Sequence, residues 1–118
     1  AKKAIEFGVD GIVVSNHGGR VLDTLVTTMD ILPKIVEVVD NKIPILLDGG
    51  ITRGTDILKA LALGASAVMI GKPIMYALAT AGALGVAHSL KILKDELEIA
   101  MALTGCKTLR DINKDILF

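Results

Sequence analysis

Short aliphatic runs alternate with helical patterns along the chain. The runs, each bounded by Gly, Pro, Asp or Asn, cover residues 11–15, 43–47 and 67–71. Runs of this kind are typical of strands buried in a parallel sheet. Apolar residues recur with helical spacing over residues 29–39, 55–63 and 86–103, and Pro73 suits the first turn of another helix. The alternation predicts an α/β chain of repeated βα units joined by right-handed crossovers.

Three parallel strands with apolar faces neither close a barrel nor cover themselves. The pattern leaves open a small α/β sandwich or the last units of a (β/α)8 barrel, a fold that usually needs about 250 residues. Residues 2–8 read as the end of a helix that Gly8 terminates. We therefore expect the chain to begin inside a helix, and residues 1–118 to be one domain or a piece of a longer one.

The charge balance and the cysteine count limit the kinds of ligand and partner that the sequence supports. The chain has 13 basic and 13 acidic residues with no long block of either sign, so nothing favours a nucleic-acid or acidic-membrane partner. Cys106 is the single cysteine and has no metal-ligand spacing around it. No signal-peptide pattern opens the chain, so we expect a cytoplasmic protein without a metal site. The apolar residues, 52% of the chain with only 3% aromatic, suit a sheet buried on both faces.

One stretch approaches the composition of a membrane helix. Between Lys72 and Lys91 the sequence contains no Asp, Glu, Lys or Arg. A span wants about 20 strongly apolar residues. This stretch consists largely of alanine, opens with Pro73 and contains Gly82 and Gly85. It predicts a pair of buried helices and no membrane span.

The loop after the first strand carries candidate catalytic residues. Its sequence is Ser15-Asn16-His17-Gly18-Gly19-Arg20. Histidine side chains ordinarily titrate near neutral pH, so His17 could accept a proton from a ligand, and the glycines would let a ligand approach the backbone. Arg20 offers a planar fork suited to a carboxylate or phosphate. A base and an anion-binding guanidinium at the end of one strand favour a functional loop over a glycine-rich turn with a purely structural role.

The next two strand ends resemble anion sites. The second ends in Asp48-Gly49-Gly50-Ile51-Thr52-Arg53, directly before a helix. Paired glycines expose backbone N–H groups, and Arg53 would balance the charge of a bound anion. The third ends in Gly71-Lys72-Pro73 at another helix start. Anion sites at two consecutive strand ends match the usual phosphate site of a (β/α)8 barrel, so we favour the barrel.

In this order and spacing the three loops resemble the family of FMN-dependent 2-hydroxy-acid oxidases and dehydrogenases, which includes glycolate and lactate oxidases. The run 15–20 with Leu22-Asp23 looks like the active-site signature of that family. The runs 48–56 and 71–73 look like its flavin-phosphate loops. The resemblance covers essentially the whole chain and implies strands six to eight of the barrel plus the C-terminal helices.

The resemblance implies a role for each loop in oxidising a small L-2-hydroxy acid to a 2-oxo acid. His17 would be the base and Arg20 would bind the substrate carboxylate. FMN would be held by residues of all three loops, Ser15, Asp48, Gly49, Gly50, Ile51, Thr52, Arg53, Gly71 and Lys72. The family usually has Arg at both positions of Thr52-Arg53, the first of them meeting the phosphate, and Arg in place of Lys72.

Other active-site groups of the family come from earlier strands. They are an Asp that orients the His, a Lys near the flavin and substrate-contacting Tyr residues, so we expect the isolated chain not to turn over substrate. A phosphate-binding half-barrel without catalysis and an assembly fragment remain alternatives. Because its strand edges and helix faces are apolar, we also expect the chain to self-associate or to pair with the missing N-terminal part of the barrel.

Overall fold

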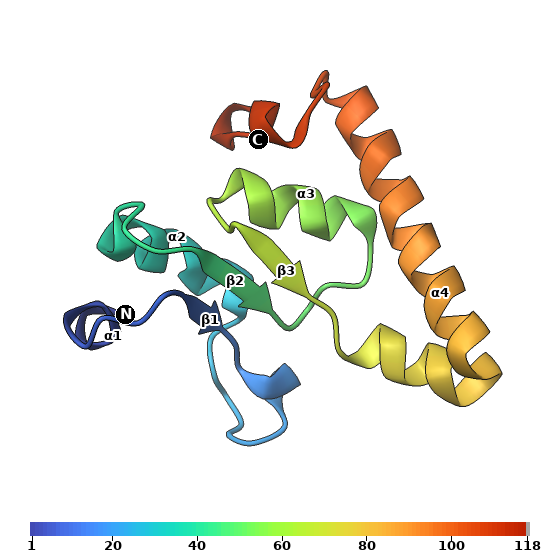
Figure 1. The fold of residues 1–118 in the computed structure, drawn as a ribbon, viewed down its shortest axis with the longest axis horizontal. Helices are drawn as coiled ribbons and strands as arrows, with labels where there is room; N and C mark the ends of the chain where they lie inside the picture. The colour runs from blue at the N-terminus through green and yellow to red at the C-terminus, as the bar shows by residue number, and fades with distance from the viewer. Residues whose placement is uncertain (118) are drawn as a thin grey trace.

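The computed structural model describes residues 1–117 and contains one parallel sheet. Its strands β1 (Ile12–Val14), β2 (Ile45–Asp48) and β3 (Ala67–Met69) lie in the order β1-β2-β3, as Figure 1 shows. Each strand is shorter than its aliphatic run but falls largely within it. The predicted α/β chain of repeated βα units is therefore confirmed.

Within residues 1–117, four helices and three short 3-10 turns accompany the sheet. The helices are α1 (Lys2–Glu6), α2 (Thr28–Val39), α3 (Gly54–Ala62) and α4 (Lys72–Leu103). The 3-10 turns are η1 (His17–Gly19), η2 (Leu109–Asp111) and η3 (Lys114–Ile116). Helix α2 begins one residue before its predicted start, because the Thr27 hydroxyl accepts a hydrogen bond of 3.2 Å from the Asp30 N–H and caps the helix there.

The two faces of the sheet differ in what covers them. The register aligns Val14, Leu47 and Val68 on the face under the helices, where Leu47 is fully buried. Val13, Leu46 and Ala67 share the opposite face, and the Val13 side chain is 51% exposed there. Within residues 1–117 the prediction of a sheet buried on both faces is wrong. Aliphatic residues on an uncovered face are what a barrel wall requires, because side chains from further strands fill the interior of a barrel.

Helix α3 lies between two hydrophobic clusters. The first joins the sheet to α2 and α3 and contains the fully buried side chains Leu32, Val39 and Leu47. The second joins α3 to the end of α4 and the C-terminal turns through Leu58, Ala62, Ala100, Met101, Cys106 and Ile112. In Figure 1 the longer arm of α4 runs beside α3, and the C-terminal segment returns to it. Both clusters together fix the position of α3.

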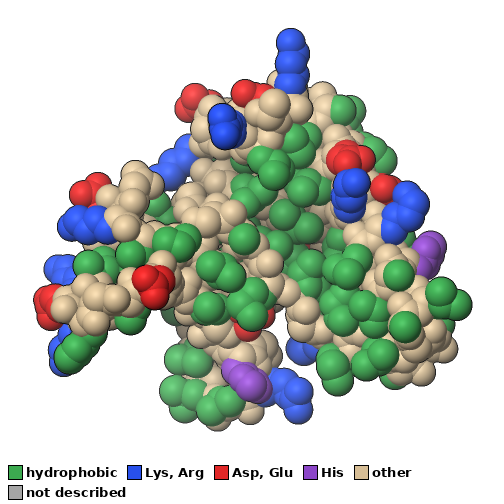
Figure 2. Space-filling model, viewed as in Figure 1, with side chains coloured by type: hydrophobic (Ala, Val, Ile, Leu, Met, Phe, Trp, Pro, Cys, Tyr) green, Lys and Arg blue, Asp and Glu red, His purple; other side chains and the backbone are tan. Residues whose placement is uncertain are grey.

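Helix α4 is bent where Ala81 (φ −145°) and Gly82 (φ 58°) leave the helical region. The predicted pair of helices is therefore present, but its predicted burial is wrong: residues 72–92 include no buried residue. Figure 2 shows apolar side chains gathered at this bend, where the exposed fractions reach 68% for Tyr76 and 82% for Leu84. The face between the two arms has little in the described chain to pack against.

By length and composition α4 is the one helix among residues 1–117 that could cross a membrane. The break at residues 81–82 separates its two arms. A span needs a rise of about 30 Å, which takes ~20 helical residues. The arm before the break is shorter than that, and the arm after it carries Lys91, Lys94, Asp95, Glu96 and Glu98. Neither arm alone therefore combines the length and the apolar character of a span.

Replacing Gly54 tests the contact between α3 and α4. A Cβ at Gly54 would lie 2.2 Å from the backbone N of Leu97 and 2.4 Å from the backbone C of Glu96. Since helix backbone cannot yield there, we expect Gly54→Ala to lower the free energy of unfolding by at least about 2 kcal/mol. Urea denaturation measures the change. The matched control is Gly71→Ala, where a Cβ meets nothing within 4 Å and the cost should stay below about 1 kcal/mol. Equal losses in the two variants would contradict this packing.

Candidate functional site

The three predicted loops meet at one edge of the sheet. Because the strands are parallel, their carboxyl ends lie at the same edge. The Ser15 hydroxyl after β1 donates a hydrogen bond of 2.6 Å to Asp48 Oδ2 at the end of β2. After β3, Lys72 Nζ lies 3.9 Å from the position that a Cβ on Gly18 would take. The structure therefore brings together the loops that the sequence places far apart.

A chain of hydrogen bonds holds His17 in an unusual backbone conformation. The φ angle of His17 is 55°, in the left-handed region that residues with a Cβ seldom adopt. Its N–H donates to Ser15 Oγ at 3.1 Å, and the same hydroxyl donates to Asp48. The Gly18 N–H donates to Asn16 Oδ1 at 3.1 Å. Backbone strain held by surrounding contacts is a feature of functional sites.

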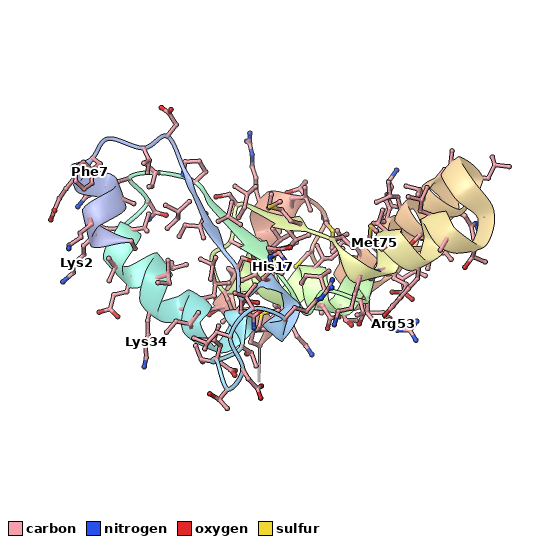
Figure 3. All side chains as sticks on the ribbon, turned by 90° about the horizontal axis from the view of Figure 1, so that it is seen from below. Lys2, Phe7, His17, Lys34, Arg53 and Met75 are labelled. Atoms are coloured by element: carbon pink, nitrogen blue, oxygen red, sulfur yellow. The ribbon has the colours of Figure 1, made fainter. Side chains whose placement is uncertain are left out.

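Turn η1 presents the two substrate-handling candidates to solvent. His17 opens the turn and Arg20 follows it, and both residues are exposed. Arg20 forms no ion pair with any residue in the described range 1–117. Figure 3 shows His17 at the strand ends, apart from Arg53. Both the imidazole and the guanidinium are available to a ligand at this edge.

The loop after β2 offers backbone groups rather than side chains. Gly49 and Gly50 have φ angles of 96° and 80°, and a Cβ on Gly50 would meet nothing within 4 Å. The Thr28 hydroxyl donates to the Gly49 carbonyl at 3.0 Å, which fixes the start of the loop. The Ile51 side chain is 3% exposed and belongs to the core. Ile51 thus anchors the loop, and only its backbone could serve a ligand.

The N-terminus of α3 is occupied by carboxylates of the chain itself. The Gly54 N–H donates to Glu96 Oε2 at 2.8 Å, and Arg53 Nη1 pairs with Glu96 Oε1 at 3.0 Å. Asp56 Oδ2 accepts from the backbone N–H groups of Thr52 and Arg53, each at 3.0 Å. The hydrogen bond from Gly54, followed by that from Arg53, lowers the pKa of Glu96 below its usual value. The carboxylate therefore stays ionised, and the cap in place, until the pH falls through that lowered pKa.

This pairing bears on the predicted anion site at Arg53. Its guanidinium has a partner in Glu96, so its role toward a bound anion stays a prediction. Helix α4 differs, because within residues 1–117 no carboxylate accepts from the backbone N–H groups at its start. Lys72, the first residue of α4, lies near η1. A helix N-terminus and a nearby ammonium group both attract anions.

Three residues at the site have roles that the sequence alone does not reveal. Asn16 and Thr28 hold the first and second loops, and Glu96 caps α3. Helical spacing alone places Glu96 among the charged residues 91, 94, 95 and 98, on what reads as the solvated face of the helix. One signal could have drawn attention to it: it lies three residues after Leu93 and four before Ala100, both buried, so it borders the apolar stripe.

Removing the Ser15 hydroxyl tests the hydrogen-bond chain. Ser15→Ala deletes the acceptor for the His17 N–H and the donor to Asp48. One lost hydrogen bond of about 1 kcal/mol should speed amide exchange at His17 about fivefold, measured by NMR. Asp23→Ala is the control in the same segment, since Asp23 holds only the Thr24 N–H. If Ser15→Ala leaves the amide exchange rate of His17 unchanged, the turn keeps its conformation without the Ser15 hydroxyl.

Comparison with known proteins identifies the family of the chain. The model of the family described as FMN-dependent dehydrogenase matches residues 1–118. The chain is 57% identical over 115 residues to a peroxisomal (S)-2-hydroxyacid oxidase of Arabidopsis thaliana, covering 98% of this chain and 32% of that protein. It is 54% identical over 117 residues to an L-lactate oxidase of Nostoc sp., covering 99% of this chain and 32% of that protein.

Solved structures give the same result for the fold. A mandelate oxidase with a monooxide FMN adduct superposes with a TM-score of 0.88 at 50% identity, over 92% of this chain and 34% of that one. A second mandelate oxidase structure gives a TM-score of 0.91 at 48% identity. The chain spans about a third of the length of these relatives and has the fold of that part of a (β/α)8 barrel. This chain belongs to the FMN-dependent dehydrogenase family of enzymes.

Proposed function

We propose that the barrel containing this chain oxidises a small L-2-hydroxy acid to the 2-oxo acid with FMN. The observation that carries the proposal is the strand-end turn on which His17 and Arg20 stand together, held by Ser15 and Asp48. The names of the similar proteins, 2-hydroxyacid, lactate and mandelate oxidases, support the substrate class.

The groups at the strand ends fit FMN. The open backbone at Gly50, the uncapped start of α4 and the ammonium group of Lys72 form a donor set for a phosphate. Ser15 and Asp48 link the His17 turn to the loop after β2 and would face the rest of the cofactor. We infer that Lys72 carries more of the phosphate charge than Arg53, which Glu96 already neutralises. FMN supplies the two-electron acceptor when it is bound.

In this proposal each side chain of the turn has one task. The guanidinium of Arg20 binds the substrate carboxylate through two parallel hydrogen bonds, which fixes the α-carbon in place. A ring nitrogen of His17 would accept one proton, and the two electrons and the second proton would pass to the bound flavin as the substrate becomes a 2-oxo acid. The Ser15 hydroxyl orients the backbone of His17, and thereby its imidazole, toward the bound substrate. The chain thus contributes the base, the carboxylate site and the phosphate site.

Turnover is proposed for the whole barrel and not for this chain alone. The chain spans about a third of its relatives, and both outer strands, β1 and β3, have one neighbour each within residues 1–117. Self-association through these edges is part of the proposal. The relatives include a peroxisomal enzyme, so the cytoplasmic location stays a prediction.

A flavin titration tests the phosphate site. FMN is added to the purified complete barrel while flavin fluorescence is followed, and we expect saturable binding. Lys72→Ala should weaken binding at least about tenfold, because it removes a charge-assisted contact, whereas Arg53→Ala should weaken it by less than about threefold. Absence of saturable binding would contradict the proposed function. Equal losses in the two variants would contradict the assignment of the phosphate charge to Lys72.

Steady-state kinetics of the complete barrel test the turn. His17→Ala should lower kcat by a factor on the order of 10² to 10⁴, since it removes the base. Arg20→Lys should raise KM about tenfold, because a lysine cannot form the two parallel hydrogen bonds. The control is His88→Ala, which changes an exposed imidazole on α4 and should leave both constants unaltered. Wild-type kcat in His17→Ala would exclude His17 as the base.

A further inference from the structure

Glu96 on α4 lies where the loop after β2 enters helix α3. Its side chain is 29% exposed, and its two oxygens reach two consecutive residues of the chain, the Gly54 N–H at 2.8 Å and the Arg53 guanidinium at 3.0 Å. More than forty residues separate these partners in the sequence. Glu96 therefore joins the loop to a different element of the fold.

The approach of α3 to α4 at this point leaves no room for a side chain. A Cβ on Gly54 would lie 2.2 Å from the Leu97 N and 2.5 Å from the Cβ of Glu96. The backbone of the loop end therefore touches the backbone of α4, and the Gly54 N–H is partly buried there. An N–H left without an acceptor in such a place is costly. Glu96 supplies the acceptor at the spot where water has little access.

Contacts hold the loop at both of its ends. At its start the Gly49 carbonyl accepts from Thr28, and at its end Glu96 and Asp56 hold Arg53 and Gly54. Between these points Gly50 has open space around it. Next to it Ile51 is buried in the core, so the part of the loop whose conformation depends on Glu96 and Asp56 is its end at Arg53 and Gly54.

We propose that Glu96 is a positioning residue that fixes the loop 49–53 in its ligand-binding conformation through Gly54 and Arg53. It does not touch the ligand. The restraint on the loop follows from these contacts. The effect on a ligand rests on the proposed function, in which the ligand is FMN. Loss of the carboxylate frees the loop end from α4 and weakens FMN binding without removing any group that contacts FMN.

Hydrogen exchange of the flavin-free protein tests the effect on the loop. We expect Glu96→Ala to speed amide exchange about tenfold in a peptide covering residues 49–56, while peptides of β1 and α2 stay unchanged. Glu96→Gln keeps a carbonyl oxygen for the Gly54 N–H and should restore most of the protection. Glu98→Ala is the control, since the ion pair that Glu98 forms in the described part of the chain is with Lys94, on the exposed face of α4. Faster exchange throughout the chain, or none in residues 49–56, would overturn the proposal.

Titration of the same variants with FMN tests the consequence for binding. Glu96→Ala should raise the Kd about tenfold, Glu96→Gln should recover to within about threefold of wild type, and Glu98→Ala should match wild type. Tight binding by wild type and Glu96→Ala alike would overturn the positioning role while leaving the proposed function intact. If wild type binds no FMN, the proposed function fails, and the exchange measurement alone decides whether Glu96 fixes the loop.

Discussion

Parallel pairing of the three strands is the constraint on which the rest of the structure depends. Each strand must be followed by a crossover, so each carboxyl end falls at the same edge of the sheet and each loop opens there. The hydrogen bond from Ser15 to Asp48 forms only because β1 and β2 end side by side. The left-handed backbone of His17 in turn depends on that hydroxyl. One rule of sheet geometry thus determines which residues share the site.

Helix α3 connects the sheet to the outer helix α4 and the C-terminal turns. It packs on the sheet through one hydrophobic cluster and on α4 and the C-terminal turns through the other. Glu96 completes the contact by accepting from Gly54 at the first turn of α3. The loop that carries Gly49 and Gly50 therefore lies between a sheet that sets its start and a helix that sets its end. Under the proposed function, the contacts that stabilise this loop also set the conformation that a ligand meets.

Local signals made most of the site predictable, and long-range contacts account for what was missed. Strands, helices and glycine-rich strand ends follow from residue types within a few positions, and the parallel order then gathers the three loops. The partner of Glu96 lies more than forty residues away, so no local pattern reveals it. The exposure of the first arm of α4 and the open face around Val13 depend on which elements pack there, which the spacing of apolar residues does not encode.

The most direct test of the central claim is the footprint of FMN on the protein, measured by hydrogen exchange and mass spectrometry with and without the cofactor. If the three strand-end loops form one site, added FMN should slow exchange in residues 15–20, 48–53 and 71–75 together and leave the peptide of η2 and η3 unchanged. Protection confined to one loop, or protection at the C-terminal turns instead, would contradict a shared site at the strand ends.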